Sequence, residues 1–327
     1  MRIDPALAAL RNDSALVASQ SRAFDGALGR WRAGSLARPV LDDLVRYGAG
    51  AALADCAALA SACGRGAAGF ARSALAPLVA ALREGPLGQP RLVCSSAGAI
   101  HRLTLGASGR AALSLALVDG DALACGRGEG APRAMFQPGE THLAVISGSA
   151  NARAVRLSGG DARRRVVGAE PLALVAGDRL RLDAGREALD LIDISGALLT
   201  LRLHRRDATT APIREYDLET GELAHQSAGD PRESRLALAA ALVGRMKRRD
   251  AVPALVRIVR DEAGEGLRWQ ALREALGLDT AQGFALLLDV AHRDGDPLAP
   301  AAQRLADDLR ARHPALAAIE EDALCLA

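Results

Sequence analysis

The sequence predicts an α+β protein with N-terminal helices, a central antiparallel β-sandwich and C-terminal α-helical repeats. Three observations predict this class. Apolar and polar residues alternate with a period of two in short runs between residues 132 and 206, as in half-buried antiparallel strands. Gly, Asp and Asn residues separate these runs at the spacing of a sandwich, jelly roll or small barrel. The flanking regions carry helical patterns instead.

Residues 1–84 are predicted to form an N-terminal helical region. The Asn12-Asp13-Ser14 cluster is a good N-cap for a helix over residues 15–31. Aromatic residues make up only 2% of the chain, so these helices must pack mainly through Ala and Leu and bury little area per residue. We therefore expect docking onto the β-sandwich to supply much of their stability.

Residues 91–206 are predicted to form the β-sandwich. The clearest alternation lies near its end, where three leucines oppose three polar residues: Leu199, Leu201 and Leu203 against Thr200, Arg202 and His204. Residues 119–132 are predicted to be a loop because they are rich in glycine. Residues 207–230 are predicted to be a linker or a hairpin that leads into the C-terminal helices.

Two segments of the sandwich resemble the motifs of a cupin, a double-stranded β-helix of jelly-roll type. They are Gly139–Gly148 (GETHLAVISG) and Val175–Asp190 (VAGDRLRLDAGREALD). The resemblance implies an internal metal site, with a histidine pair just before Pro138, a glutamate near Thr141 or His142 and a further histidine near Ala188. A metal site needs about three or four converging ligands, and only His142 matches. The resemblance thus implies a cupin-like shell that has lost most of its metal ligands, and no cofactor is expected.

A metal-dependent enzyme with non-standard ligands is the alternative. His101, His142 and His204 all lie on predicted strands. If these strands brought the three side chains to one cavity, they could bind Fe, Mn or Zn, and the chain would be a cupin-type oxidoreductase such as a dioxygenase. Taken singly, such histidines are more often ordinary strand residues at a sheet edge.

The C-terminal region, residues 231–327, contains an internal repeat at an offset of 31 residues. The segments DAVPALVRIVRDE and GLRWQALREALG resemble a HEAT repeat, which implies a surface that binds another protein or a peptide. Such units stack because none can bury its apolar face alone. The alternative is that the repeats merely brace the β-sandwich. The matched residues are Ala254, Leu255, Gly264, Leu267 and Ala271 with Ala285, Leu286, Gly295, Leu298 and Ala302.

A basic patch lies just before the repeat, at the end of a helix that is predicted over residues 232–246. It consists of Arg245, Lys247, Arg248 and Arg249. Such a patch could contact a nucleic acid backbone, which would make the chain a nucleic-acid-associated regulator. Few aromatic residues are available to stack on bases, so a solvated face is the favoured interpretation and a nucleic acid partner is not expected.

The remaining features indicate a cytoplasmic protein, and the Ala- and Arg-rich composition suggests GC-rich coding, as in a bacterium. The five cysteines form no CxxC motif, and neither a signal peptide nor a membrane-spanning stretch is predicted. The favoured function is a non-catalytic binding or accessory (adaptor) protein. It would bind a small molecule in the β-sandwich and a protein at the repeats, and a homodimer is compatible with the sequence.

Overall fold

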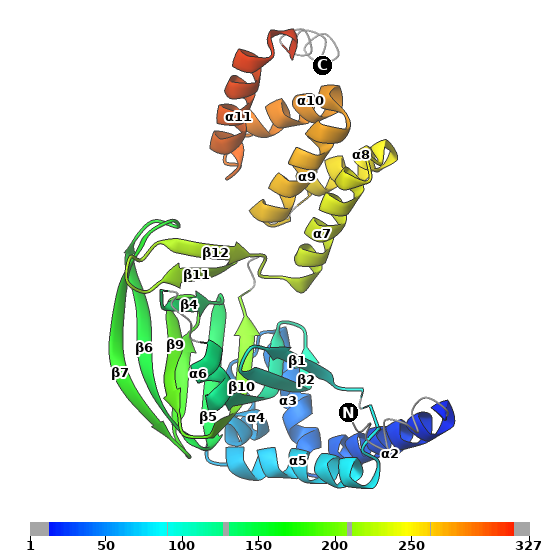
Figure 1. Cartoon of the computed structure of the whole chain (residues 1–327), viewed down its shortest axis with the longest axis vertical. Coiled ribbons are helices and arrows are strands. Elements are labelled where there is room, and N and C mark those ends of the chain that lie inside the picture. Colours follow the sequence, from blue (N-terminus) through cyan, green and yellow to red (C-terminus); the bar gives the residue numbers. More distant parts are fainter. Residues whose placement is uncertain (1–12, 90, 127–130, 208–210, 262, 317–327) are drawn as a thin grey trace. The chain divides into compact units, whose positions relative to one another are not determined.

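The computed structural model describes residues 13–89, 91–126, 131–207, 211–261 and 263–316, shown in Figure 1. Two compact units are present. The first, here called the β unit, comprises residues 1–208 and 215–224, and the second, the helical unit, comprises residues 209–214 and 225–327. The predicted α+β class is confirmed. None of the helices within the described ranges is long and apolar enough to cross a membrane.

Among the residues that the structure describes, four helices precede the strands of the β unit. As predicted, Asp13 caps the first helix, and its side chain accepts a hydrogen bond from the Leu16 amide at 3.0 Å. The third of these helices, α4 (Ala57–Cys63), is short, and a 3₁₀ turn at Leu53–Asp55 precedes it. The four helices are α2 (Ser14–Ala33), α3 (Ala37–Ala49), α4 (Ala57–Cys63) and α5 (Ala67–Glu84).

The strands form three sheets. The six-stranded sheet has the order β1 (Val93–Ala97), β2 (Ile100–Ser108), β3 (Ala111–Asp119), β10 (Ala197–Arg206), β5 (Gly139–Ser147) and β8 (Arg179–Asp183). A second sheet has the order β7 (Arg165–Val175), β6 (Ser149–Gly160) and β9 (Glu187–Ile194). The third has the order β12 (Leu223–Ser227), β11 (Ile213–Asp217) and β4 (Arg133–Phe136). The prediction of a loop over residues 119–132 is wrong in part, because helix α6 (Gly120–Gly126) forms there and Asp119 caps it.

The strand order of the β unit is that of a jelly roll. Strand β3 pairs with β10, β5 pairs with β8 and β6 pairs with β7, all antiparallel. Strand β4 lies beside β9. The eight strands therefore form a nested hairpin that is rolled so that successive pairs alternate between two packed layers, which is the jelly-roll arrangement.

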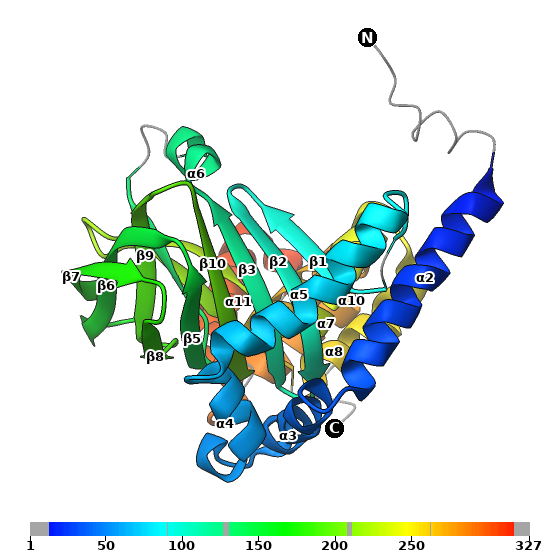
Figure 2. The ribbon, with the colours of Figure 1, turned by 90° about the horizontal axis from the view of Figure 1, so that it is seen from below.

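Both faces of the six-stranded sheet are covered. Figure 2 shows α3, α4 and α5 along one side of this sheet, and the leucines on that face share a core with the helices (Leu113, Leu115, Leu201 and Leu203). The opposite face packs against the β7-β6-β9 sheet through a second core that includes Val118, Val145 and Leu198. The helices and the sandwich, which the sequence analysis treats as separate regions, are thus parts of one unit.

Glycines at the two ends of β5 explain part of the GETHLAVISG motif. Gly139 has φ +130° and Gly148 has φ +88°, a region that favours glycine. A Cβ atom at Gly139 would lie 2.1 Å from the Arg205 carbonyl oxygen. Glycine at these two positions therefore allows β5 to begin and end tightly against its neighbour β10.

The described part of the helical unit contains five α-helices: α7 (Pro231–Arg245), α8 (Val252–Arg260), α9 (Glu265–Leu278), α10 (Thr280–Ala291) and α11 (Ala299–Arg312). The 31-residue offset relates α8 to α10 and α9 to α11. Leu255 and its counterpart Leu286 are both buried in the core of this unit. The C-terminal region is therefore helical, while its assignment to HEAT repeats stays a prediction.

Candidate functional site

Strands β5 and β10 present different chemistry on their two faces. Thr141 lies opposite His204 in the antiparallel ladder, and Leu143 lies opposite Arg202. Because side chains alternate along a strand, these residues share the inner face with Val145 and Leu198. The expectation that β10 is half-buried, with its polar residues in water, is wrong: His204 is 5% exposed. Its polar residues face the interior of the sandwich because the leucines lie beneath the helices.

The polar residues on this inner face contact one another. The Arg202 guanidinium donates to Gln137 Oε1 at 3.1 Å and to Thr141 Oγ1 at 3.5 Å. The Thr141 hydroxyl lies 2.8 Å from His204 Nδ1. Arg102 belongs to the same face, because it pairs with Ala116, which also pairs with Thr200 of β10. We call Arg102, Gln137, Thr141, Arg202 and His204 the inner basic cluster.

The electrostatics of the inner basic cluster are those of unneutralised positive charge. Burial, together with the positive charge of Arg102, lowers the pKa of Arg202 to about 10. Burial, together with Arg202, Arg206 and Arg102, lowers the pKa of His204 to about 3. His204 is therefore neutral at pH 7, and the charge of the cluster is carried by its arginines.

Two nitrogen atoms of the cluster lack hydrogen-bond partners among the described residues. They are Arg102 Nε and His204 Nε2, and both atoms are buried. Buried polar atoms in native proteins nearly always have a partner, which is often a water molecule or a ligand. The cluster therefore has hydrogen-bonding capacity that the described protein atoms do not use.

The inner basic cluster does not fit a divalent metal ion. The cupin resemblance implies metal ligands just before Pro138 and near Thr141, and the structure has Gln137 and Thr141 there, both in contact with the Arg202 guanidinium. A fixed cation at these positions repels a second one. In the described part of the chain, no group of three or more His, Cys, Asp or Glu side chains could hold a metal ion.

The three candidate histidines are not brought together. His204 lies on the inner face, whereas His142 lies on the opposite face, with its Nε2 3.9 Å from Glu140 Oε1. His101 is exposed, and its Nδ1 forms a hydrogen bond with Ser96 Oγ at 2.9 Å. Side chains on opposite sides of one sheet cannot ligate a common ion, so this set does not form a metal site.

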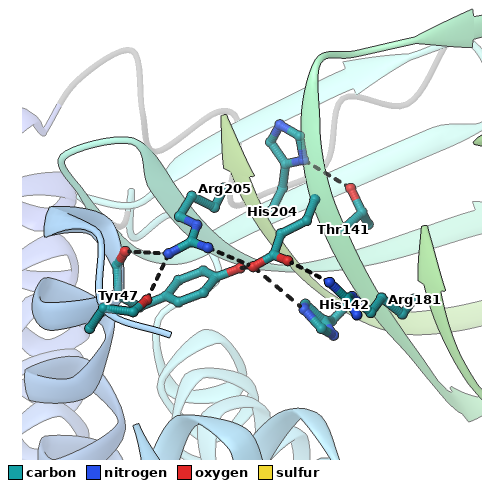
Figure 3. A network of polar contacts seen from close by, with 8 residues as sticks. Tyr47, Thr141, His142, Arg181, His204 and Arg205 are labelled. Atoms are coloured by element: carbon teal, nitrogen blue, oxygen red, sulfur yellow. Dashed lines mark hydrogen bonds and ion pairs between the residues drawn. The ribbon is translucent and has the colours of Figure 1, made fainter. Parts of the chain in front are cut away.

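On the helix-facing side of the same strands, a network centres on Glu140, and Figure 3 shows it beside the Thr141–His204 pair. Its carboxylate accepts hydrogen bonds from the Tyr47 hydroxyl and from the Arg205 guanidinium, the latter at 3.0 Å. Arg205 also stacks over the Tyr47 ring, 4.1 Å from its centroid, and donates to the Ala51 carbonyl at 2.7 Å. These contacts attach α3 to β5 and β10.

Burial opposes ionisation of Glu140, but the Tyr47 hydrogen bond and the charges of Arg205, His142 and Arg181 outweigh it. Together they hold the pKa of this carboxyl below its usual value. A cavity of about 590 Å³ opens beside Glu140. Arginines and carboxylates line it in mixture, and every charge of the Glu140 network has a partner, so the network fits a structural role.

The predicted basic patch lies at the end of α7 and in the turn that follows. Arg245, Lys247, Arg248 and Arg249 are all exposed. Arg248 forms two hydrogen bonds to the Asp250 carboxylate, at 2.7 and 2.8 Å, so one of the four charges is neutralised locally. The patch is weaker than the sequence suggests.

The inner basic cluster includes three residues that the sequence alone did not indicate as site residues: Arg102, Gln137 and Arg202. The available signal was one arginine at a polar position in each of two alternating runs, residues 99–105 and 199–204. Without knowledge that helices cover the leucine face of these strands, those arginines look like ordinary solvent-facing residues.

The chain was compared with protein families, curated proteins and solved structures. No protein-family model and no curated protein matches the chain. Solved structures that match include an RmlC-like cupin from Shewanella frigidimarina NCIMB 400 (10% identity, 36% of this chain, 86% of that chain, TM-score 0.24). Another is a cupin superfamily protein from Desulfitobacterium hafniense DCB-2 (16% identity, 35% of this chain, 84% of that chain, TM-score 0.22). A third is an ectoine synthase from P. lautus (10% identity, 34% of this chain, 67% of that chain, TM-score 0.23). The jelly-roll assignment rests on the strand order of the β unit.

Proposed function

We propose that the chain is a non-catalytic binding or accessory protein whose jelly-roll domain holds a small polar molecule without a metal ion. The observation that carries this proposal is the position of Arg202. Its guanidinium contacts Gln137 and Thr141, where the cupin resemblance implies metal ligands. A binding site of this kind can use arginine, threonine and glutamine side chains to orient a ligand, and no general base or nucleophile is needed.

Metal analysis of the purified chain tests the proposal. Protein is prepared without chelators, then loaded separately with Fe(II), Mn(II) and Zn(II) and dialysed before elemental analysis. We expect well below one metal ion per chain in every case. Stoichiometric metal that is lost in His204→Ala or His142→Ala would overturn the proposal and favour the cupin-type oxidoreductase instead.

A second role, docking of a protein partner, is supported by an observation on α7. Leu238, Leu242 and Met246 are 72%, 56% and 56% exposed, and their spacing of four residues places them on one helix face. Arg245, Lys247 and Arg249 are close by in the sequence. We propose that this surface, together with the helical repeats, binds a protein segment that is amphipathic and acidic.

Defined peptides test the docking role. One helical peptide carries a leucine stripe flanked by glutamates, and the other carries the same stripe flanked by lysines. Fluorescence anisotropy should detect binding of the acidic peptide, and salt should weaken that binding. The double variant Leu238→Asn/Leu242→Asn should abolish the binding. The control Leu36→Asn, which alters a similarly exposed leucine in the β unit, should leave it unchanged. Equal binding of both peptides would contradict the role. Salt-sensitive binding of duplex DNA that needs Arg248 and Arg249 would favour the nucleic-acid regulator.

A further inference from the structure

The geometry points to an oxyanion, a carboxylate or a phosphate group, as the ligand of the inner basic cluster, held between Arg102, Arg202 and His204. This inference rests on the proposed function, since it names the chemical class of the molecule that the jelly-roll domain holds. Neither the cupin resemblance nor the comparisons assign such a site.

The two arginines of the inner basic cluster lie on the same face of the six-stranded sheet. Ala116 of β3 pairs with Arg102 of β2 on one side and with Thr200 of β10 on the other. Ser114 pairs with Arg202 in the next inward-facing row. Arg102 and Arg202 therefore lie on the same face of the sheet, on two strands that β3 separates, and they are offset by one inward-facing row. The positive charge of Arg102 nevertheless acts on Arg202 across β3.

The charge of the inner basic cluster is not balanced by the described residues around it. Arg102 is the charged group that most affects Arg202 among the described residues, and it has the same sign. The side-chain contacts of Arg202 are to Gln137 and Thr141, both neutral. Buried charges are normally paired, yet neither guanidinium forms an ion pair with a carboxylate of the described residues. Two guanidinium groups in this arrangement leave a site that favours an anion.

Two nitrogen atoms of the inner basic cluster are unused hydrogen-bond donors. Arg102 Nε is buried without a partner in the described structure, and so is His204 Nε2. When His204 Nδ1 accepts a hydrogen bond from the Thr141 hydroxyl, the proton of the neutral ring lies on Nε2, which then becomes a donor. Guanidinium groups match the geometry of carboxylate and phosphate oxygens, and hydrogen bonds with a charged partner are the stronger ones.

The arrangement also explains why arginine is tolerated inside a β-sandwich. Without a ligand, an unpaired buried guanidinium costs stability, and an apolar residue of similar length would be preferred there. We therefore expect Arg202→Met to be more stable than the natural protein in the absence of anions. An arginine with a purely structural role would show the opposite sign.

The experiment compares thermal midpoints of the β unit in the full chain, titrated with inorganic phosphate, acetate or succinate against chloride at equal ionic strength. The variants are Arg202→Met, Arg102→Met and, as a matched control, Arg179→Gln, which removes an exposed arginine from β8 of the same sheet. General salt effects act equally on all four proteins, so the difference between them reports the site. The phosphate and carboxylate arms distinguish the two kinds of oxyanion.

We expect a saturable rise in the midpoint for the natural protein and for Arg179→Gln with at least one oxyanion. Loss of either inner arginine should weaken the apparent affinity by about 10- to 100-fold. Equal responses of Arg202→Met and the natural protein, or no response beyond that to chloride, would overturn the inference. If Arg202→Met does not fold, Arg102→Met decides by the same criteria. A metal-loaded protein would refute the proposed function, whereas a metal-free protein indifferent to oxyanions would refute this inference alone.

Discussion

Glu140→Gln should destabilise the β unit far more than Glu187→Gln, although both carboxylates line the same cavity. The two side chains are almost equally exposed, 22% and 23%, and each binds an arginine. The difference lies in the partners, because Arg205 is 21% exposed and Arg156 is 74% exposed. After the substitution, Arg205 remains desolvated without its counter-charge, whereas Arg156 is hydrated by water.

The magnitudes follow from this difference. Removing one partner of a buried ion pair costs about 3–5 kcal/mol, and we expect about 2–3 kcal/mol here because Glu140 is partly exposed and Gln can still accept from Tyr47. The surface pair at Glu187 should be worth about 0–1 kcal/mol. At an m-value of about 3 kcal/mol per M of urea, Glu140→Gln lowers the unfolding midpoint by roughly 0.7–1 M.

Trp31 is a suitable reporter, because it lies in the core that joins the helices to the sheet. Urea unfolding is followed by tryptophan fluorescence in a Trp269→Phe background, which removes the signal of the helical unit. Equal midpoints for Glu140→Gln and Glu187→Gln would refute the reasoning, since partner burial would then have no effect. Adding Arg205→Met to Glu140→Gln should restore part of the loss, because it removes the unpaired charge.

Two further predictions follow. His204→Gln should reduce the acid sensitivity of the β unit. The pKa of the natural histidine is about 3 in the folded protein and about 6.5 in the unfolded chain, so the unfolded chain takes up a proton first as the pH falls. The contribution of His204 to stability is therefore full above pH 6.5 and falls as the pH drops towards 3, by about 2 kcal/mol at pH 5. Urea midpoints at pH 7.5 and 5 measure this, with the exposed His101→Gln as control, and an unchanged pH dependence would contradict it. Asp296→Asn should destabilise the helical unit by about 3 kcal/mol, because Asp296 pairs with the buried Arg268. Asp289→Asn breaks an exposed pair with Arg260 and should cost only about 0–1 kcal/mol. Trp269 fluorescence reports unfolding in both variants, and similar losses of stability would contradict this prediction.

The sequence predicts the strands of the β unit well because their signal is local. Alternation along residues 199–204 correctly predicts β10, and the glycines at 139 and 148 correctly delimit β5. The nested pairing of β3 with β10 is not local, since it joins segments far apart in the chain. It could be anticipated only through the resemblance of two short motifs to a cupin.

The sidedness of the strands could not be predicted from alternation alone. A period of two shows that a strand has two different faces, but not which face meets water. For β10 the answer depends on α3, α4 and α5, which cover the leucines. The same uncertainty concealed the site, because Arg102 and Arg202 are ordinary residues on a solvated strand and exceptional ones inside a sandwich.

The N-terminal helices therefore help the β unit to tolerate the buried arginines of the inner basic cluster. In an uncovered sandwich, the inner face of each sheet must supply the apolar core, and two unpaired guanidinium groups there would be difficult to offset. Here the outer face of β3, β5 and β10 already contributes buried leucines and Ala144 to the core shared with the helices. The core shared with the helices supplies apolar burial that stabilises the β unit. This burial offsets the apolar contacts that are missing from the inner face around Arg202 and His204. By this reasoning, a substitution that weakens the helix–sheet contacts should be tolerated better when positions 102 and 202 carry apolar residues than when they carry arginine.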